Sequence, residues 1–255
     1  MRNLVRNMYI KFLRNLIKSE IQKQRLKLIL WDIFPYYKLF FLKNMSLVNK
    51  LKLLSTCLRV DWNIVHAHKP CEMMPIMMEV SQKKGNFTQS FVEAGCWMGG
   101  SSVKFSVICK MMGYNLQIFD SFEGVQPGDV SIPESIFYGE YVGPIEVVKG
   151  NIKKYGDISI CSFHKGWFEN TFKDYNTLTK FVYIDCDLSK GTIDVLSGVL
   201  NNLDKTEKCT IYTQDYHILT VKETLDSDET WKKLGVGKPS IRHVARNLAV
   251  IDIKI

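Results

Sequence analysis

The stretch FVEAGCWMGGSS at residues 91–102 constrains the fold of this chain more than any other feature. Two apolar residues lead into Glu93, and the glycines at 95, 99 and 100 are followed by two serines. Glycine carries no Cβ, so a turn built from it can approach a ligand closely. A helix that begins at the serines would add free N–H groups and the positive end of its dipole. The stretch predicts a buried strand, a tight ligand-binding turn and a helix.

A second acidic residue, Asp120, ends the next apolar run, 25 residues after Gly95. A carboxylate there can accept hydrogen bonds from both hydroxyls of a ribose. The alternative is that Asp120 caps the turn that follows it. The glycine pattern E-x-G-x-x-x-G departs from the dinucleotide fingerprint G-x-G-x-x-G. It favours a nucleoside cofactor without a pyrophosphate, and S-adenosylmethionine is the first candidate. The candidate cofactor-binding residues are Glu93, Gly95, Gly99, Gly100, Ser101, Ser102, Asp120 and Ser121.

Apolar runs and helical spacing alternate along the rest of the chain. This alternation predicts an α/β fold, Rossmann-like, with a mostly parallel central sheet and helices on both faces. We expect strands near 90–94, 115–119, 158–163, 180–185, 208–213 and 248–255, and helices from about Cys71 and at 100–112, 145–155, 190–203 and 221–233. The Gly- and Pro-containing segment 121–144 is expected to form a loop at the mouth of the sheet.

The net charge of +8 is concentrated at the N-terminus. Residues 1–50 hold 11 Lys and Arg against two acids, whereas residues 51–255 hold 23 against 24. A near-neutral body argues against nucleic acid as the main partner. Apolar residues at helical spacing in 2–30 predict a basic amphipathic helix. We therefore divide the 255 residues into a helical extension, 1–55, and one domain, 56–255.

The amphipathic helix has three alternative uses. It could pack on its own domain or in a homodimer, make peripheral contact with an anionic membrane surface through residues 1–50, or bind nucleic acid. The aromatic cluster that follows it, from Trp31 to Phe41, favours burial or an interface over a free arm. The most apolar window, Leu28–Leu42, contains Asp32, Pro35 and Lys38 and is too short to span a bilayer.

Seven widely spaced cysteines, an odd number without a C-x-x-C pair, argue against a disulfide framework or a structural zinc site. A reducing cytoplasm fits this pattern best. The expected location is cytoplasmic, with association at the inner face of the membrane as the alternative.

Four segments in this order resemble the macrocin O-methyltransferase family of class I, S-adenosylmethionine-dependent sugar O-methyltransferases. They are FVEAGCWMGGSS, IFDSFEGV, FHKGWFENT and FVYIDCDLSKGT, and the resemblance covers roughly residues 60–255. It implies magnesium-assisted methylation of a sugar hydroxyl in the biosynthesis of a glycan, polysaccharide or glycosylated metabolite. It also implies that Gly166–Phe168 forms a wall of the pocket.

The resemblance implies that Asp185 and Asp215 bind the metal and that Asp187 is the general base. The residue types agree, because hard oxygen ligands at strand ends suit Mg²⁺, and a metal lowers the pKa of a bound hydroxyl. A sugar hydroxyl still needs a base. One departure is Gln214, where typical members have an acid; its amide oxygen can still ligate. The predicted metal ligands are therefore Asp185, Gln214 and Asp215.

Alternatives remain open at this point. Strand-end aspartates can simply cap the following turn, and His217, two residues after Asp215, is an alternative base. The other histidines are interpreted as structural. The acceptor could be a catechol-like or other small molecule, since metal chelation of two hydroxyls would be shared. A non-enzymatic or nucleic-acid-binding protein on the same fold is disfavoured by the intact glycine turn and the near-neutral body.

Overall fold

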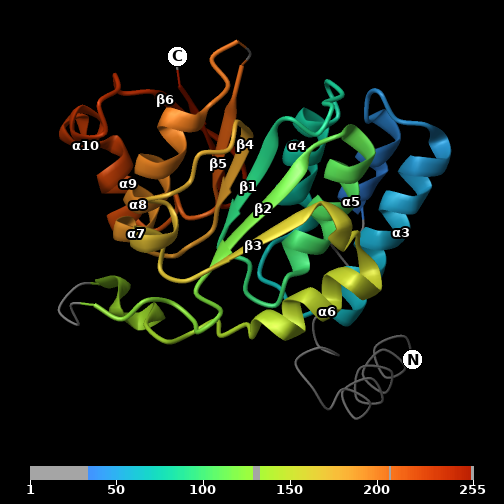
Figure 1. Ribbon diagram of the computed structural model, residues 1–255, viewed down its shortest axis with the longest axis horizontal. Helices are drawn as coiled ribbons and strands as arrows, with labels where there is room; N and C mark the ends of the chain where they lie inside the picture. The colour runs from blue at the N-terminus through green and yellow to red at the C-terminus, as the bar shows by residue number, and fades with distance from the viewer. Residues whose placement is uncertain (1–33, 129–132, 207, 254–255) are drawn as a thin grey trace, which may run out of the picture.

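The computed structural model describes residues 34–128, 133–206 and 208–253 (Figure 1). Its centre is a seven-stranded sheet in the order β3-β2-β1-β4-β5-β7-β6. The first five strands are parallel, and β7 runs antiparallel to both of its neighbours. The strands are β1 (Ser90–Ala94), β2 (Asn115–Asp120), β3 (Cys161–Lys165), β4 (Thr179–Ile184), β5 (Thr210–Thr213), β6 (Ser240–Ala245) and β7 (Leu248–Asp252).

Helices cover both faces of the sheet, as the alternating pattern predicts (Figure 1). One face carries α3 (Leu47–Asn63), α4 (Pro70–Val80), α5 (Gly100–Met112) and α6 (Ile145–Tyr155), which share a core with the 3₁₀ helix η2 (Phe34–Phe41). The other carries α7 (Phe168–Thr171), α8 (Ser189–Val199), α9 (Leu219–Asp226) and α10 (Asp228–Lys233). Within the described ranges, none of the helices has the length and apolarity needed to cross a membrane.

The central strands form where the sequence has uninterrupted apolar runs, because they are covered on both faces. Every residue of β1 and of β4 is buried. At the edge the expected boundaries are wrong: residues 158–160 form a 3₁₀ turn, η4, and β3 starts at Cys161. The turn forms because the Asp157 side chain accepts a hydrogen bond from the Ser159 N–H at 3.0 Å.

Three further expectations differ from the structure. The helix expected at 221–233 is divided at Ser227 into α9 and α10. The helix expected at 190–203 ends at Val199 and continues as a 3₁₀ turn, η5 (Leu200–Asn202). Strand β6 was not predicted, because its side chains are exposed or half-buried at the sheet edge and leave no apolar run.

The strand register brings the site residues to one edge of the sheet. Ala94 pairs with Phe119 on one side and with Ile184 on the other, and Ile184 pairs with Thr213. The carboxyl ends of β1, β2, β4 and β5 are therefore level. The residues that follow them, Gly95, Asp120, Asp185 and Gln214, lie next to one another across the sheet, where ligands bind in open α/β folds.

The described part of the N-terminal region belongs to the core of the domain. Tyr36, Leu39 and Leu42 are buried in the same core as Leu53 of α3, and η2 packs against α3 and α4. Residue 55, the expected end of the extension, lies inside α3. The helix expected at residues 2–30 lies outside the described residues.

A buried polar network joins this region to α5. Lys104 is fully buried and its Nζ donates to the Asp61 carboxylate, to the Tyr36 hydroxyl at 3.2 Å and to His68 Nε2 at 3.0 Å. The Tyr36 hydroxyl donates in turn to Asp61 at 2.5 Å. Burial alone would raise the pKa of Asp61, but the Lys104 charge and a bond from His66 hold it well below its usual range. Asp61 is therefore ionised at neutral pH.

Replacing Lys104 with Met should lower the free energy of unfolding by about 3–5 kcal/mol, because it leaves the Asp61 charge buried and uncompensated. Lys110→Met is the matched control on the exposed end of α5 and should cost less than about 0.5 kcal/mol. Because the pKa of Asp61 is depressed, the full effect is present at pH 7 and is lost only as the pH falls through that low value. Urea unfolding at pH 7 measures the stability of both variants. Equal unfolding midpoints for the two would contradict a structural role for the Lys104–Asp61 ion pair.

Candidate active site

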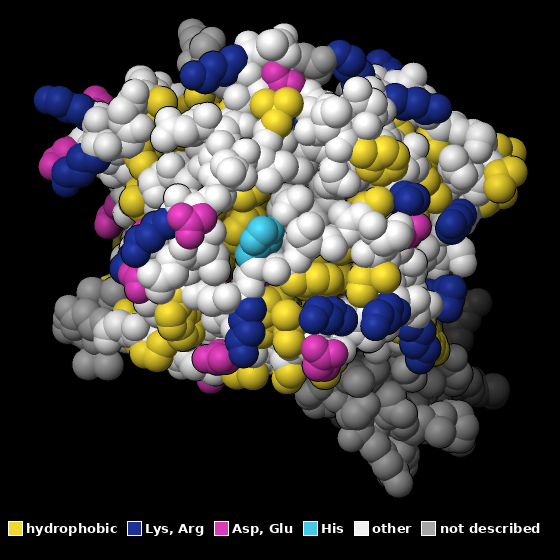
Figure 2. Space-filling model, viewed as in Figure 1, with side chains coloured by type: hydrophobic (Ala, Val, Ile, Leu, Met, Phe, Trp, Pro, Cys, Tyr) yellow, Lys and Arg dark blue, Asp and Glu magenta, His cyan; other side chains and the backbone are white. Residues whose placement is uncertain are grey.

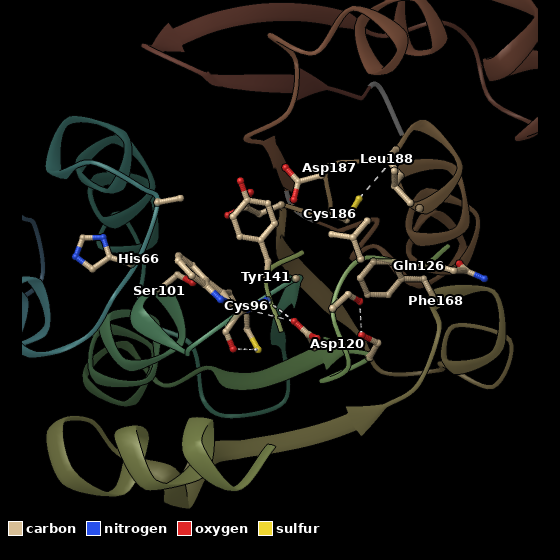
Figure 3. A pocket seen from close by; sticks show the side chains of 18 of the residues that line it. His66, Cys96, Ser101, Asp120, Gln126, Tyr141, Phe168, Cys186, Asp187 and Leu188 are labelled. Atoms are coloured by element: carbon tan, nitrogen blue, oxygen red, sulfur yellow. Dashed lines mark hydrogen bonds between the residues drawn. The ribbon is translucent and has the colours of Figure 1, made fainter. Parts of the chain in front are cut away.

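A cavity that is partly open to solvent lies at the carboxyl edge of the sheet, with about 910 Å³ of space between its lining atoms and the outside. Figure 3 shows Asp120 and Asp187 entering it from the ends of different strands, with the rings of Tyr141 and Phe168 on either side of the space between them. The two acids therefore face one cavity from opposite ends.

The glycine turn lies at the floor of this cavity, and two of its positions are unsuited to a side chain. Gly95 has φ +88°, and a Cβ there would overlap the carbonyl oxygen of Asp185. Gly99 has φ +78° and is the N-cap of α5, whose first turn lies on the cavity. A helix start has N–H groups without a partner in the helix, and here it borders the cavity, which suits the negative carboxylate of a cofactor tail.

Asp120 both fastens the turn and lines the cavity. Its Oδ2 accepts hydrogen bonds from the N–H groups of Cys96 at 2.7 Å and Trp97 at 3.3 Å, and Oδ1 accepts from Phe122 at 2.7 Å. The capping role and the ligand-binding role are compatible for a single further bond, because the three backbone N–H groups leave one of the carboxylate's about four lone-pair positions for a ribose hydroxyl. Burial outweighs these bonds and raises the pKa of Asp120.

Asp187 lies opposite Asp120 in a turn that Asp215 fixes. Asp215 Oδ2 accepts hydrogen bonds from the N–H groups of Cys186 at 2.8 Å and Asp187 at 3.0 Å. Asp187 has φ +60°, a left-handed conformation that is sparsely populated outside glycine. Trp97 and Tyr141, also in the cavity wall, have positive φ values of +46° and +57°. Backbone strain of this kind is concentrated at functional sites.

The acids at this edge are hard to ionise together. Burial raises the pKa of Asp187 to about 6. Burial, followed by the charge of Asp187, raises the pKa of Asp215 to about 8. Burial and both of these neighbours raise the pKa of Asp185 well above its usual range, although the Tyr183 hydroxyl donates to it at 3.1 Å. Clustered carboxylates with raised pKa values are typical of a site that works on protons or binds a cation.

A scan against protein-family models matches residues 73–234 to the macrocin O-methyltransferase (TylF) family. The match covers more than half of the chain. This protein belongs to the macrocin O-methyltransferase family. It is therefore an S-adenosylmethionine-dependent O-methyltransferase, and the cavity at the sheet edge is where that cofactor is expected.

Solved structures share the fold of this methyltransferase. The O-methyltransferase NovP is 17% identical with a TM-score of 0.64, and the match covers 82% of this chain and 99% of NovP. The calicheamicin methyltransferase CalS11 is 15% identical with a TM-score of 0.58, covering 86% and 91% of the two chains. The S-adenosylhomocysteine-bound methyltransferase PaMTH1 of Podospora anserina is 12% identical with a TM-score of 0.53, covering 80% and 88%. A comparison with curated proteins found no match.

The residues of this methyltransferase fit its cofactor. Glu93, beneath the turn, is fully buried beside the serines of the first turn of α5 and lies outside the lining of the cavity. Burial raises its pKa to about 8. Glu93 is therefore mostly uncharged at pH 7 and supports the turn from beneath. Gly95, Gly100, Ser101 and Asp120 line the cavity and are the residues that would hold the cofactor, because the helix start suits its carboxylate and Asp120 can accept from its ribose.

The three residues predicted to bind Mg²⁺ carry the oxygen ligands that this ion prefers, but only one of them lines the cavity. Asp185 lines the cavity, whereas Gln214 and Asp215 are buried beneath it. Another group of metal-type side chains does converge among the described residues. The ligand atoms of Asp61, His66 and His68 all lie within 4.8 Å of one another. There the ammonium of Lys104 already contacts Asp61 and His68, so that cluster has its cation.

The cavity brings together part of the predicted set. Its lining includes Gly95, Gly100, Ser101, Asp120, Ser121, Asp185 and Asp187. Outside the lining are Glu93, Gly99, Ser102, Gln214, Asp215 and His217. His217 lies with its Nδ1 3.1 Å from the Gln214 carbonyl oxygen, as a structural histidine would. Trp167 and the rest of Gly166–Phe168 are in the wall, where the family resemblance puts them.

Sequence reasoning missed part of the cavity rim. Val65–His68 and Gln126 line the cavity, and so does Tyr141, whose ring stands edge-on to Trp97 at 5.2 Å. The H-x-H pair at 66 and 68 can be seen in the sequence, where both histidines are interpreted as structural. For His68 that role holds, because its Nε2 accepts from Lys104. Tyr141 lies in the loop 121–144, where spacing carries no information about contacts.

Proposed function

We propose that this methyltransferase acts on a hydroxyl of a sugar, within a glycan, polysaccharide or glycosylated metabolite. One observation carries the proposal: Asp120 and Asp187 line a single cavity, so the cofactor site and a candidate base face the same space. Aromatic side chains of Trp97, Tyr141 and Phe168 provide flat apolar walls of the kind that pack on sugar rings. The family description and the name of CalS11 support an acceptor of this class.

S-adenosylmethionine supplies, when bound, a methyl group activated by its sulfonium. The chain supplies binding at one end of the cavity through Asp120, the glycine turn and the first turn of α5. At the other end Asp187 accepts the proton of the attacking hydroxyl. A pKa of about 6 leaves Asp187 mostly ionised at pH 7 and makes it a stronger base than an ordinary aspartate. Asp215 holds the turn on which Asp187 lies through two backbone hydrogen bonds.

Mg²⁺ would be held by Asp185, Gln214 and Asp215, where it would lower the pKa of a bound hydroxyl and relieve the repulsion among the aspartates. Carboxylate and amide oxygens are the ligands this ion prefers. The raised pKa values of Asp185 and Asp215 support the assignment, because burial and then the charges of neighbouring carboxylates raise them, and a bound cation would offset both effects. The protein would work as a peripheral or non-membrane enzyme in the cytoplasm.

The test is a methyl-transfer assay with labelled cofactor and a panel of acceptors. Nucleotide-activated sugars, free glycosides and catechol are offered with Mg²⁺, and again with a chelator. We expect a methyl ether on a sugar that has adjacent hydroxyls, lost with the chelator and restored by excess Mg²⁺. Methylation of catechol alone would refute the sugar assignment, and full activity with the chelator would refute the metal assignment.

A further inference from the structure

Residues 34–51 have a buried side and an exposed apolar side. Tyr36, Leu39 and Leu42 point into the core. The opposite side, which we call the outer face, consists of large hydrophobic side chains that no core contact explains. They are Phe34, Tyr37, Phe40 and Phe41 of η2 and Leu47, Val48 and Leu51 of α3.

The outer face is a continuous surface. The ring of Tyr37 lies 5.0 Å from Phe34 and 6.1 Å from Phe41. Lys50 of α3 donates to the Phe40 carbonyl at 2.8 Å, which fastens the two elements together. The exposed fractions are high: 78% for Phe34, 74% for Val48 and 67% for Phe41. A contiguous patch of this kind marks an interaction site, whereas single exposed hydrophobics need no explanation.

The charge around the outer face indicates which kind of partner can bind there. Between Asp32 and Asp61 the sequence has no acid, but it has four lysines, Lys38, Lys43, Lys50 and Lys52, and Arg59. Figure 2 shows Lys and Arg side chains together with hydrophobic ones along the side of the molecule formed by α3. Two copies joined through this face would oppose cations to cations. An anionic partner with an apolar interior fits both the charge and the hydrophobic residues.

We propose that the outer face docks this methyltransferase on the surface of an anionic lipid bilayer. Aromatic and aliphatic side chains would enter the headgroup region, and the lysines would contact the lipid phosphates. The outer-face residues of α3 lie in its first turns, and the helix ends at Asn63, just before the cavity-lining segment Val65–His68, so the docking surface and the cavity rim lie at opposite ends of one helix. The proposal concerns a site outside the cavity and does not depend on the identity of the acceptor.

The experiment is co-sedimentation of the full chain with vesicles. One set contains phosphatidylcholine alone, and the other contains phosphatidylcholine mixed with phosphatidylglycerol. The test variant is Phe41→Asp with Val48→Asp. The matched control is Leu219→Asp, which replaces a side chain 64% exposed on α9. Lys38→Glu with Lys43→Glu is a second test variant, chosen because both lysines are exposed and the change does not reach the core.

Wild type and the Leu219 control should bind the anionic vesicles and bind phosphatidylcholine poorly. Both test variants should lose about tenfold or more in partitioning while still binding S-adenosylhomocysteine, which reports a folded cavity. Equal partitioning of the variants and the control would overturn the proposal, as would failure of wild type to bind anionic vesicles. Sedimentation of wild type as a dimer that Phe41→Asp with Val48→Asp dissociates would assign the face to a second copy of the chain and overturn the proposal too.

Discussion

Asp187→Asn should reduce kcat by about 10²–10⁴-fold while affinity for S-adenosylhomocysteine stays unchanged. The amide has nearly the shape of the carboxylate and tolerates the φ of +60° found here, so the turn is preserved. What is lost is the acceptor for the proton of the attacking hydroxyl. Steady-state kinetics with a methylated-product readout, together with calorimetry of S-adenosylhomocysteine binding, separate the two effects.

The pH profile provides a second readout for the same residue. Since burial raises the pKa of Asp187 to about 6, kcat/KM should rise with pH below 6 and level off above it. Asp174→Asn, which removes an exposed acid on the protein surface, is the control and should leave both rate and profile unchanged. An Asp187→Asn variant with the wild-type rate and profile would remove the base assignment and return attention to His217.

Gly95→Ala should abolish cofactor binding and lower the free energy of unfolding by several kcal/mol. The new Cβ would overlap the Asp185 carbonyl oxygen, and φ of +88° is strained for any L side chain. The two strand ends would have to separate, because Gly95 donates its N–H to Phe119 at 2.9 Å and Asp185 donates to Ala94 at 2.9 Å. The floor of the cavity would be displaced with them.

Gly150→Ala is the matched control for this substitution. Gly150 is exposed in the middle of α6, a Cβ there meets nothing within 4 Å, and its backbone is helical. Alanine should therefore raise the free energy of unfolding by about 0.5–1 kcal/mol and leave cofactor binding intact. Urea unfolding and calorimetry measure both variants. If Gly95→Ala bound S-adenosylhomocysteine like wild type, the turn would not be the cofactor floor.

The sequence was informative where one physical requirement dominated. Strands β1 and β4 are buried on both faces, so their apolar runs identified them, and the glycines at 95 and 99 marked a turn that does have positive φ. The register of the parallel strands then places Asp120 and Asp185 at the same edge of the sheet, on either side of β1. The match to the macrocin O-methyltransferase family agrees with the motifs that carried the resemblance.

What the sequence did not reveal depends on contacts between distant segments. Spacing could not show that Asp215 accepts backbone N–H groups from the Asp187 turn, nor that Lys104 lies buried among Asp61, Tyr36 and His68. In the same way, a half-exposed edge strand such as β6 and a rim residue such as Tyr141 leave no periodic signal. Residues whose role is set by a partner far along the chain become visible only in the folded structure.

A crystal structure of the complex with S-adenosylhomocysteine is the most direct test of the account. One ribose hydroxyl should lie within hydrogen-bond distance of the Asp120 carboxylate, the tail should lie over the first turn of α5, and the sulfur should face the side of the cavity that holds Asp187. A ligand bound outside this cavity, or bound within it with its ribose away from Asp120, would contradict the central claim.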